Sequence, residues 1–482
     1  MIDGASSIGL LLALSLPWFT GAAWTRALLA GSGRHNLPLV LGYGYFLGLL
    51  LVTSLIHVWH WLDIDFHFSA IAIIVALLAL PALALCRLRP DAPVQGSGEY
   101  QWRLGPVLLV AFLLALILWR QFALLEELLL RPLFAWDAWM NWAPRAIVWF
   151  HHGELVEFVH PQTWMKHPGE TLYTLGNRQA SNYPPMIPLM LLWSMLGAGT
   201  WDGGALYLPW LLAPLCFCMA MFGHLRLAGV SPLLATLACY LLLSLPYLNV
   251  HTMLAGYADL WLALAFGLAV CALYEWRSTR RACWALLALL LALMCTQLKV
   301  PGYFLALIIL LGVVRTWLNL APRTELLLVL GGCAVLALLL GDGVTFSLPG
   351  LGRFSFAWGQ IEVGPLGQFI LEYHPVGWVM GETFLHMINW HLLGVLVPLL
   401  LVNALCRGHL FHHPPTEVLV VAAALVFILF VFFLTGYHSQ AENYVAINRV
   451  LLYLMPALVF TSFLYLHGRV LDAGLRVQTQ VP

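Results

Sequence analysis

The first residue that could carry chemistry is Asp137, a single carboxylate among the tryptophans of FAWDAWMNWAPRA, residues 134–146. Two isolated cations follow much later in the chain, Lys299 in TQLKVPGYF and Arg449 in ENYVAINRVLLY. A carboxylate can take a proton from an attacking hydroxyl, and cations can hold a phosphate leaving group. An acid with separated cations therefore suits chemistry on a phosphorylated lipid.

Asp137 also has a purely structural interpretation. If 136–146 were helical, Asp137, Asn141 and Arg145 would share one face, and the acid would pair with Arg145 at the membrane surface. Pro144 argues against a smooth helix through that point. Both interpretations of Asp137 stay open at the level of sequence.

The isolated cations and a second acid also allow either a functional or a structural interpretation. The chain has only two lysines, Lys166 and Lys299, and Lys299 lies between two apolar segments with almost no loop. Such a cation is usually functional or paired, or it snorkels to the interface. Asp259 in AGYAD stands at the start of a predicted helix, where it could simply cap the positive helix end. Arg449, taken singly, could be an interface anchor.

The composition is that of a membrane protein. The 482 residues are 62% hydrophobic and only 9% charged, whereas a soluble domain is about 25% charged. The apolar runs are near the roughly 20 residues that a spanning helix needs, and they do not alternate as barrel strands do. We therefore predict an all-α polytopic membrane protein. The net charge of zero suggests no nucleic-acid partner.

The connections between the predicted spans alternate between the two sides of the membrane, and their arginine content distinguishes those sides. The spans lie near 7–25, 38–59, 68–86, 104–126, 205–223, 232–249, 257–275, 282–298, 301–317, 326–346, 388–406, 417–436 and 449–467. The connections on one side carry most of the arginines, and basic short loops stay cytoplasmic. We expect the long loops 127–183 and 347–387 to face outward, with the N-terminus outside and the C-terminus inside.

Because segment 184–200 can be counted in more than one way, the sequence predicts 12 to 14 transmembrane helices. The stretch PDAPVQGSGEYQ, 90–101, is the best candidate boundary. It would separate an N-terminal three-helix part, 1–103, from a transmembrane module, 104–482, that holds both outward loops.

Histidines give weak evidence for a metal. The loop 127–183 contains four histidines, but no H-E-x-x-H or similar ligand spacing occurs. We therefore assign no metal ligands and no certain cofactor. A divalent metal is considered but not favoured.

Several ordered motifs make the chain resemble the GT-C superfamily of membrane glycosyltransferases. More narrowly, it is similar to bacterial polyprenyl-phosphate-sugar transferases related to protein mannosyltransferases and the lipid A aminoarabinose transferase. The matching residues extend from the first long loop to the last helix and form the patterns D-A-W-x-x-W-x-x-K/R-A, Y-P-x-x-x-P-L, G-Y-A-D, K with a small turn, and R-L-L-x-x-x-x-P. They are Asp137, Ala138, Trp139, Trp142, Arg145, Ala146; Tyr183, Pro184, Pro188, Leu189; Gly256 to Asp259; Lys299, Gly302; and Arg449, Leu451, Leu452, Pro456, with Val450 for the first leucine.

The resemblance implies an inverting transfer of one sugar from a polyprenyl-phosphate donor. The acceptor would be a glycan, lipid or protein at the outer face of a bacterial cytoplasmic membrane. Asp137 would be the general base, while Arg145, Lys299 and Arg449 would contact the donor phosphate. The pocket would be lined by Asn182, Tyr183 and Asp259.

Two departures and three alternatives accompany this resemblance. Many members have paired acids in the first loop, but here Asp137 is followed by Ala138, which disfavours a metal-dependent mechanism. The three predicted helices of residues 1–103 precede the module that carries the motif, where many relatives have one. The alternatives are a transporter or flippase of lipid-linked sugars, an O-antigen polymerase or ligase using Arg353 and His374, and a structural assembly subunit.

Overall fold

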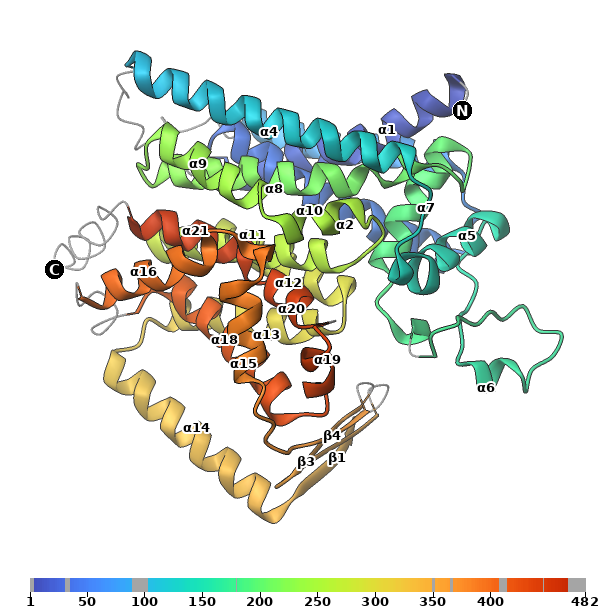
Figure 1. The fold of residues 1–482 in the computed structure, drawn as a ribbon. Coiled ribbons are helices and arrows are strands. Elements are labelled where there is room, and N and C mark those ends of the chain that lie inside the picture. Colours follow the sequence, from blue (N-terminus) through green and yellow to red (C-terminus); the bar gives the residue numbers. More distant parts are fainter. Residues whose placement is uncertain are drawn as a thin grey trace.

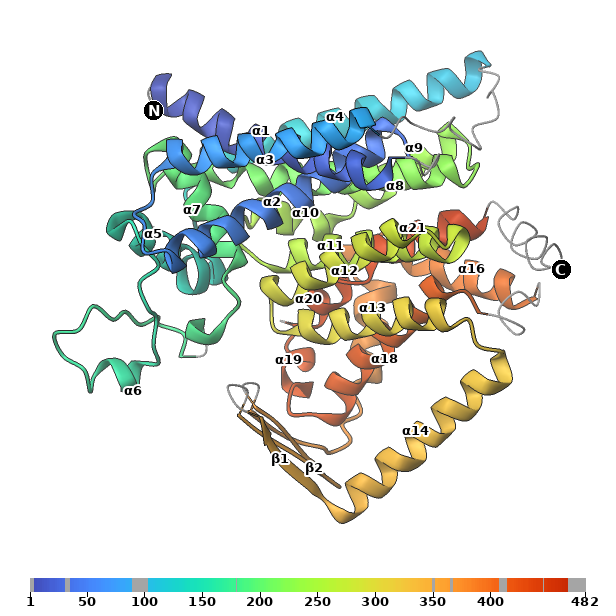
Figure 2. The same cartoon turned by 180° about the vertical axis from the view of Figure 1, so that it is seen from behind.

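The chain forms a bundle of long apolar helices with smaller elements at one end (Figures 1 and 2). The computed structural model describes residues 4–30, 35–88, 103–178, 180–348, 352–364, 367–406, 414–444 and 446–466. The first half of the bundle consists of α1 (Gly4–Leu29), α2 (Leu37–Trp61), α3 (Phe68–Leu88), α4 (Leu104–Leu130), α7 (Met186–Ala198), α8 (Leu208–Leu227), α9 (Pro232–Leu243) and α10 (Pro246–Met253).

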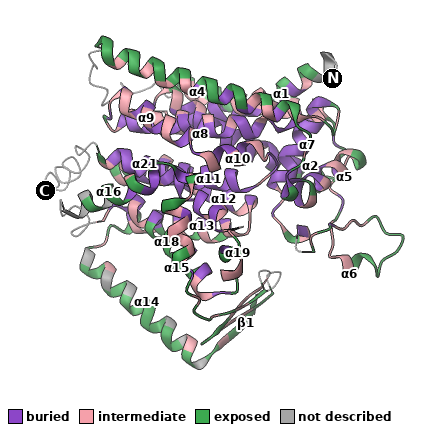
Figure 3. Cartoon of the chain, in the orientation of Figure 1, coloured by how far each residue is buried: buried purple, intermediate pink, exposed green. Residues whose placement is uncertain are grey.

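The second half of the bundle surrounds one central helix, α11 (Asp259–Thr279). Every residue in the most apolar stretch of α11 is buried, and Figure 3 shows buried residues concentrated around it. It packs against α8 and against four later helices, namely α12 (Ala282–Leu298), α13 (Pro301–Leu318), α18 (Thr416–Leu434) and α21 (Met455–Leu466). The remaining long helices are α14 (Pro322–Asp342) and α16 (Leu393–Cys406).

The prediction of an all-α polytopic membrane bundle is confirmed. Within the described ranges, nine helices are long and apolar enough to cross a membrane, or ten if a bent pair counts as one span. Two shorter apolar helices, α7 and α12, complete the packing. The total of 12–14 crossings stays a prediction, as does the division at residue 103. In the structure, α1 and α2 pack directly on α7 and α8.

One expected span is not a straight helix. The expected span 232–249 is bent by 60° between α9 and α10. Pro246 begins α10, where its missing N–H removes a helical hydrogen bond. The last span, Ile447–Leu466, comprises α20 (Ile447–Leu452) and α21.

Segment 184–200 does not form a long span. Its helix, α7, has 13 residues, or about 20 Å, against a hydrocarbon core of about 30 Å. Just after α7, the ideal Cβ position of Gly204 lies 2.4 Å from the Leu128 carbonyl at the end of α4. The chain therefore leaves α7 beside the same bundle end from which the 127–183 segment emerged.

The region predicted as an outward loop at 347–387 contains most of an antiparallel sheet that was not predicted, and its outward orientation stays a prediction. The strands pair in the order β1-β2-β3-β4 and are β1 (Val344–Leu348), β2 (Gly352–Ala357), β3 (Gln360–Val363) and β4 (Gly367–Ile370). Helix α14 ends at Asp342, four residues before the expected end of that span. Alternating apolar and polar residues after that point favour a strand.

Short elements fill the rest of the bundle end that carries the sheet and the 127–183 segment. In that segment they are η1 (Ala138–Trp142, a π-helix), α5 (Ala143–His152), α6 (Pro161–Trp164) and η2 (Ala180–Asn182), and η3 (Gly204–Tyr207) follows α7. After the sheet they are α15 (Gly377–Gly381), η5 (Glu382–His386), η6 (Ile388–Trp390) and α19 (His438–Glu442).

The C-terminal end of α11 is held by an ion pair. Arg277 donates two hydrogen bonds to Glu417 of α18, at 2.9 and 2.8 Å, and the Glu417 side chain is fully buried. Tyr465 of α21 also donates to Glu417. This interaction joins three helices at a buried carboxylate.

Glycines allow α1 and α2 to pack backbone to backbone. A Cβ at Gly48 would lie 1.9 Å from the Pro17 carbonyl oxygen, and one at Gly44 would lie 2.5 Å from the Ala22 backbone. Small residues that permit close approach are typical of helix contacts in membranes.

We predict that Gly48→Ala destabilises the protein by about 1–3 kcal/mol, because the added methyl group would meet rigid backbone. Gly105→Ala in α4 is the matched control, since nothing lies within 4 Å of its Cβ position and alanine favours helix. Unfolding in mixed detergent micelles, followed by circular dichroism, measures both. Equal stability of the two variants would contradict the close packing of α1 on α2.

Candidate functional site

Four charged side chains from distant parts of the sequence meet at one end of the bundle. Asp137 precedes η1, Asp259 begins α11, Lys299 joins α12 to α13, and Arg449 lies on α20. We call these four residues the charged cluster. Its two carboxylates and two cations lie in contact with each other, so the cluster is neutral overall.

Asp259 is the most buried member of the cluster. Its side chain has 0% exposure, and Oδ1 accepts hydrogen bonds from Lys299 Nζ at 2.6 Å and from the Tyr453 hydroxyl at 2.5 Å. Oδ2 accepts from Arg449 Nη2 at 2.6 Å and Nε at 3.0 Å. Ionised carboxylates are buried only when they are paired in this way.

Helix capping does not account for Asp259. The N-cap of α11 is Ala258, and no side chain bonds the free amides there. Asp259 follows it as the first helical residue, and its carboxylate turns to the two cations instead.

Asp137 has a different environment from Asp259. Arg449 Nη2 bridges to Asp137 Oδ2 as well as to Asp259, and the Asp137 side chain is 12% exposed. Among the described residues, no side chain donates a hydrogen bond to Asp137 Oδ1. One oxygen of Asp137 is therefore held and the other is available.

The structural interpretation that paired Asp137 with Arg145 is wrong. Residues 138–142 form a π-helix, which changes the rotation between Asp137 and α5. Arg145 Nη1 donates to the Tyr183 carbonyl at 2.8 Å, and its guanidinium lies 5.1 Å from the centre of the Trp149 ring.

Arg145 is a buried cation with an unusual set of neighbours. It is 7% exposed, its Nε has no hydrogen-bond partner, and no carboxylate within the described part of the chain pairs with it. Burial lowers the pKa of Arg145 to about 10. A guanidinium held by rings and one carbonyl keeps unused capacity to bind an anion.

Lys299 and Arg449 owe their positions to short helix connections. Lys299 has extended backbone between α12 and α13, and Pro301 starts the second helix at a position that proline favours. Arg449 lies near the start of the final span. Tyr453 follows it by four residues, so both side chains reach Asp259 from one side of the chain.

Two tyrosines that were not among the predicted site residues, Tyr257 and Tyr453, also contact the charged cluster. Tyr257 places its ring 4.8 Å from the Arg449 guanidinium carbon, and its hydroxyl accepts from the Asp137 backbone N–H at 3.4 Å. Burial raises the pKa of Tyr257. The G-Y-A-D motif contained Tyr257, and the i, i+4 spacing from Arg449 is a signal that could have indicated Tyr453.

Gly256 allows the two acid-bearing segments to touch. Its φ of 93° is in the region that favours glycine, and a Cβ there would lie 2.6 Å from the Ala138 Cβ. Larger side chains at Gly256 or Ala138 would separate the segments that carry Asp259 and Asp137. The alanine after Asp137 thus has a packing role.

Tyr183 and Asn182 lie at the edge of the site. The Tyr183 ring packs on Trp142 with ring centres 5.3 Å apart, and burial raises the pKa of its hydroxyl. Asn182 is exposed on η2, and no hydrogen bond within the described residues joins it to the charged cluster. Four of the seven predicted site residues form the charged cluster, and two more, Arg145 and Tyr183, contact each other. The roles of all seven stay predictions.

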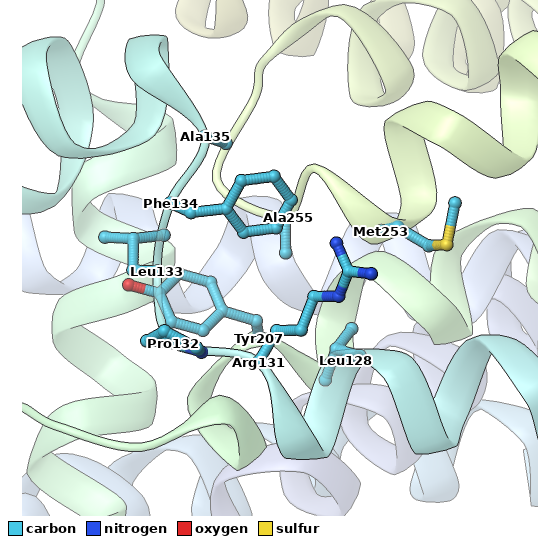
Figure 4. A pocket seen from close by; sticks show the side chains of 9 residues that line it. All are labelled: Leu128, Arg131, Pro132, Leu133, Phe134, Ala135, Tyr207, Met253 and Ala255. Atoms are coloured by element: carbon cyan, nitrogen blue, oxygen red, sulfur yellow. The ribbon is translucent and has the colours of Figure 1, made fainter.

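A small cleft lies beside the cluster, between the segments that lead to Asp137 and Asp259 (Figure 4). Phe134 and Ala135 line it from the Asp137 side, and Met253 and Ala255 from the Asp259 side. Arg131 is the only charged residue in its lining, and Glu127 pairs with that guanidinium. The cleft is therefore mainly apolar and adjoins a polar centre.

The described residues contain no group of three or more histidines, cysteines, aspartates or glutamates that could hold a metal ion. The bridge between Asp137 and Asp259 is formed by the guanidinium of Arg449. Comparisons with protein-family models, with curated proteins and with solved structures give no match for this chain.

We predict that Asp259→Asn lowers the free energy of unfolding by about 3–5 kcal/mol, because Lys299 and Arg449 would lose their buried counter-charge. Asp137→Asn should lower it by only about 1 kcal/mol, since Arg449 keeps Asp259 and Asp137 is partly exposed. Unfolding in mixed detergent micelles compares the two directly. Equal losses would contradict the central position of Asp259.

We also predict that Arg145→Met changes the free energy of unfolding by no more than about 1 kcal/mol, because the lost carbonyl contact is offset by the removal of an unpaired buried charge. Arg277→Met is the matched comparison and should destabilise by about 3–5 kcal/mol, since it leaves Glu417 buried and alone. The same unfolding measurement applies. A large loss for Arg145→Met would assign Arg145 to structure and not to ligand binding.

Proposed function

We propose that this protein is an inverting glycosyltransferase of the GT-C type. It transfers one sugar from a polyprenyl-phosphate donor to a hydroxyl of a glycan, lipid or protein acceptor. The charged cluster is the reaction centre. The arginine-rich connections support a location in a bacterial cytoplasmic membrane with this centre on the outer side.

The difference between the two acids is the observation that carries the proposal. Asp259 is fully buried and surrounded by four hydrogen bonds, so it organises cations and is not available to substrate. Asp137 has one held oxygen and one available oxygen, and its side chain is 12% exposed against 0% for Asp259. This pairing of a structural acid with a reactive acid suits general-base catalysis by Asp137.

The reaction needs a proton acceptor and a stabilised leaving group. Asp137 Oδ1 takes the proton while the acceptor oxygen attacks the anomeric carbon. The bond from that carbon to the phosphate oxygen breaks, and the polyprenyl phosphate departs with the electron pair. Attack from the face opposite the phosphate inverts the anomeric configuration.

Cations for the departing phosphate are present on two sides. Arg449 uses Nε and Nη2 for the carboxylates, which leaves Nη1, and the ammonium group of Lys299 has three hydrogens with one used for Asp259. Arg145 adds a buried positive charge without a carboxylate partner in the described chain. Charge-assisted hydrogen bonds from such groups stabilise phosphate oxygens.

Exposed aromatic rings next to Asp137 support a lipid-linked substrate. Trp136 and Trp139 flank the acid and are 53% and 47% exposed, while Phe134 leads into the cleft. Tryptophan favours the boundary between lipid and water. A polyprenyl chain approaching from lipid would bring its phosphate to the level of the cluster.

The test is turnover by purified protein in liposomes that contain a radiolabelled polyprenyl-phosphate sugar and membrane extract as the acceptor source. We predict that Asp137→Asn lowers kcat about 100-fold to 10,000-fold, because a general base contributes that factor. The KM for the donor should change little. Glu154→Gln, an exposed acid in the same 127–183 segment, is the control and should keep full activity.

Three results would overturn the proposal. Full activity of Asp137→Asn would remove the assignment of the base. Movement of the intact lipid-linked sugar across the bilayer without transfer would favour a transporter. A requirement for a diphosphate donor would instead favour the polymerase or ligase alternative.

A further inference from the structure

The sheet that follows α14 has two faces of opposite character. Side chains alternate across a strand, and directly paired residues share a face. On one side, Val344 and Phe346 of β1 pair with Phe356 and Phe354 of β2. The pairing continues through β3 to β4. We call this side the apolar face; it is formed chiefly by Val344, Phe346, Phe354, Phe356, Ile361 and Phe369.

The apolar face is a continuous surface of rings and branched side chains. The Phe346 and Phe354 rings stack with centres 5.4 Å apart and an angle of 6°, and Phe356 lies 6.2 Å from Phe346. None of its residues is polar or charged. Such a uniformly apolar surface is not expected on a sheet that has water on both faces.

The other face of the same sheet is polar. Thr345 and Ser355 are joined by a hydrogen bond of 3.1 Å between their hydroxyl groups. Arg353 pairs with Glu362 at 3.7 Å, and the Arg353 side chain is 62% exposed. The sheet is thus amphipathic, with all its charged groups on one side.

The described chain covers the apolar face only in part, since its residues other than Phe346 are intermediate in exposure. Phe346 and Leu348 are each 43% exposed. At the β4 edge, the Phe369 ring lies 6.4 Å from the ring of Tyr437, which precedes α19. Figures 1 and 2 show the sheet at the end of α14, away from the helices that surround α11.

The helix before the sheet identifies lipid as the covering partner. Helix α14 has no charged residue between Glu325 and Asp342, and most of its described leucines are exposed, including Leu327 at 68% and Leu338 at 69%. In a membrane protein, exposed leucines on such a helix face lipid. Only Gly343, with a φ of 70°, separates the end of α14 from β1.

A tryptophan joins the sheet to the end of that helix. Trp358, in the turn between β2 and β3, donates its backbone N–H to the Leu340 carbonyl at 3.1 Å. Its side chain is 69% exposed, and tryptophan favours the membrane boundary. The sheet is therefore fixed to the end of α14, and its strands pair with one another through backbone hydrogen bonds.

We propose that the sheet is a membrane-surface element whose apolar face lies on the lipid at the end of α14. The phenylalanines enter the boundary between headgroups and acyl chains, and the Arg353 side points to water. This arrangement follows the rule for amphipathic helices at interfaces, applied to a sheet. It does not depend on the proposed enzymatic function.

The test places a fluorescent label on alternate residues of β1 in the full chain. Bimane is attached to Phe346→Cys or Leu348→Cys on the apolar face, and to Thr345→Cys or Ser347→Cys on the polar face, in a background with the native cysteines replaced. The protein is reconstituted in phosphatidylcholine vesicles with or without doxyl-labelled phosphatidylcholine. Aqueous iodide is the second quencher.

We predict that doxyl lipid quenches the labels at 346 and 348 several-fold more strongly than those at 345 and 347, and that iodide gives the reverse order. A label at Cys333, an exposed position in the middle of α14, is the reference for lipid contact. Unchanged size-exclusion profiles exclude misfolded variants from the comparison.

Three results would overturn this proposal. Strong iodide quenching at all four positions would show a sheet standing in water. Protection of 346 and 348 from both quenchers would show that protein covers the apolar face. Loss of doxyl quenching on addition of polyprenyl phosphate would show that this face holds the isoprenoid chain of a ligand.

Discussion

The burial of one carboxylate, Asp259, is the constraint on which the arrangement of this protein depends. A fully buried anion at the head of the central helix requires counter-charges, and these come from the α12–α13 turn and from α20. The chain must therefore bring three separated segments to one point. Asp137 joins them only through Arg449, which gives the first long segment its place in the assembly.

Ion pairs lie at both ends of α11, but they differ in how completely their charged groups are paired. At one end Arg277 holds both carboxylate oxygens of Glu417, and Tyr465 donates to one of them as well. At the other end the pairing is incomplete, since Asp137 keeps an available oxygen and Arg145 has no acid partner in the described chain. Saturated ion pairs fix helices, whereas incomplete ones retain capacity for a ligand.

Sequence reasoning predicted the helical membrane bundle because long apolar runs are a strong local signal. It also identified Asp137, Asp259, Lys299 and Arg449, since isolated charges stand out in such a chain. It could not predict their pairing, because contacts between residues 40 to 312 positions apart depend on packing. The sheet after α14 was missed for another reason: the alternation in VTFSL is short and follows directly on an apolar run.

The π-helix at 138–142 has a consequence for the spacing of the motif around Asp137. A π-turn holds one more residue than an α-turn, so removal of one residue from this stretch would restore an ordinary helix. The acid would then rotate by about 100° relative to α5, since an α-helix has 3.6 residues per turn. Removal of this one residue would hardly change the hydropathy or the composition of the chain. The number of residues between Asp137 and Arg145 is therefore as much a part of this site as the residues themselves.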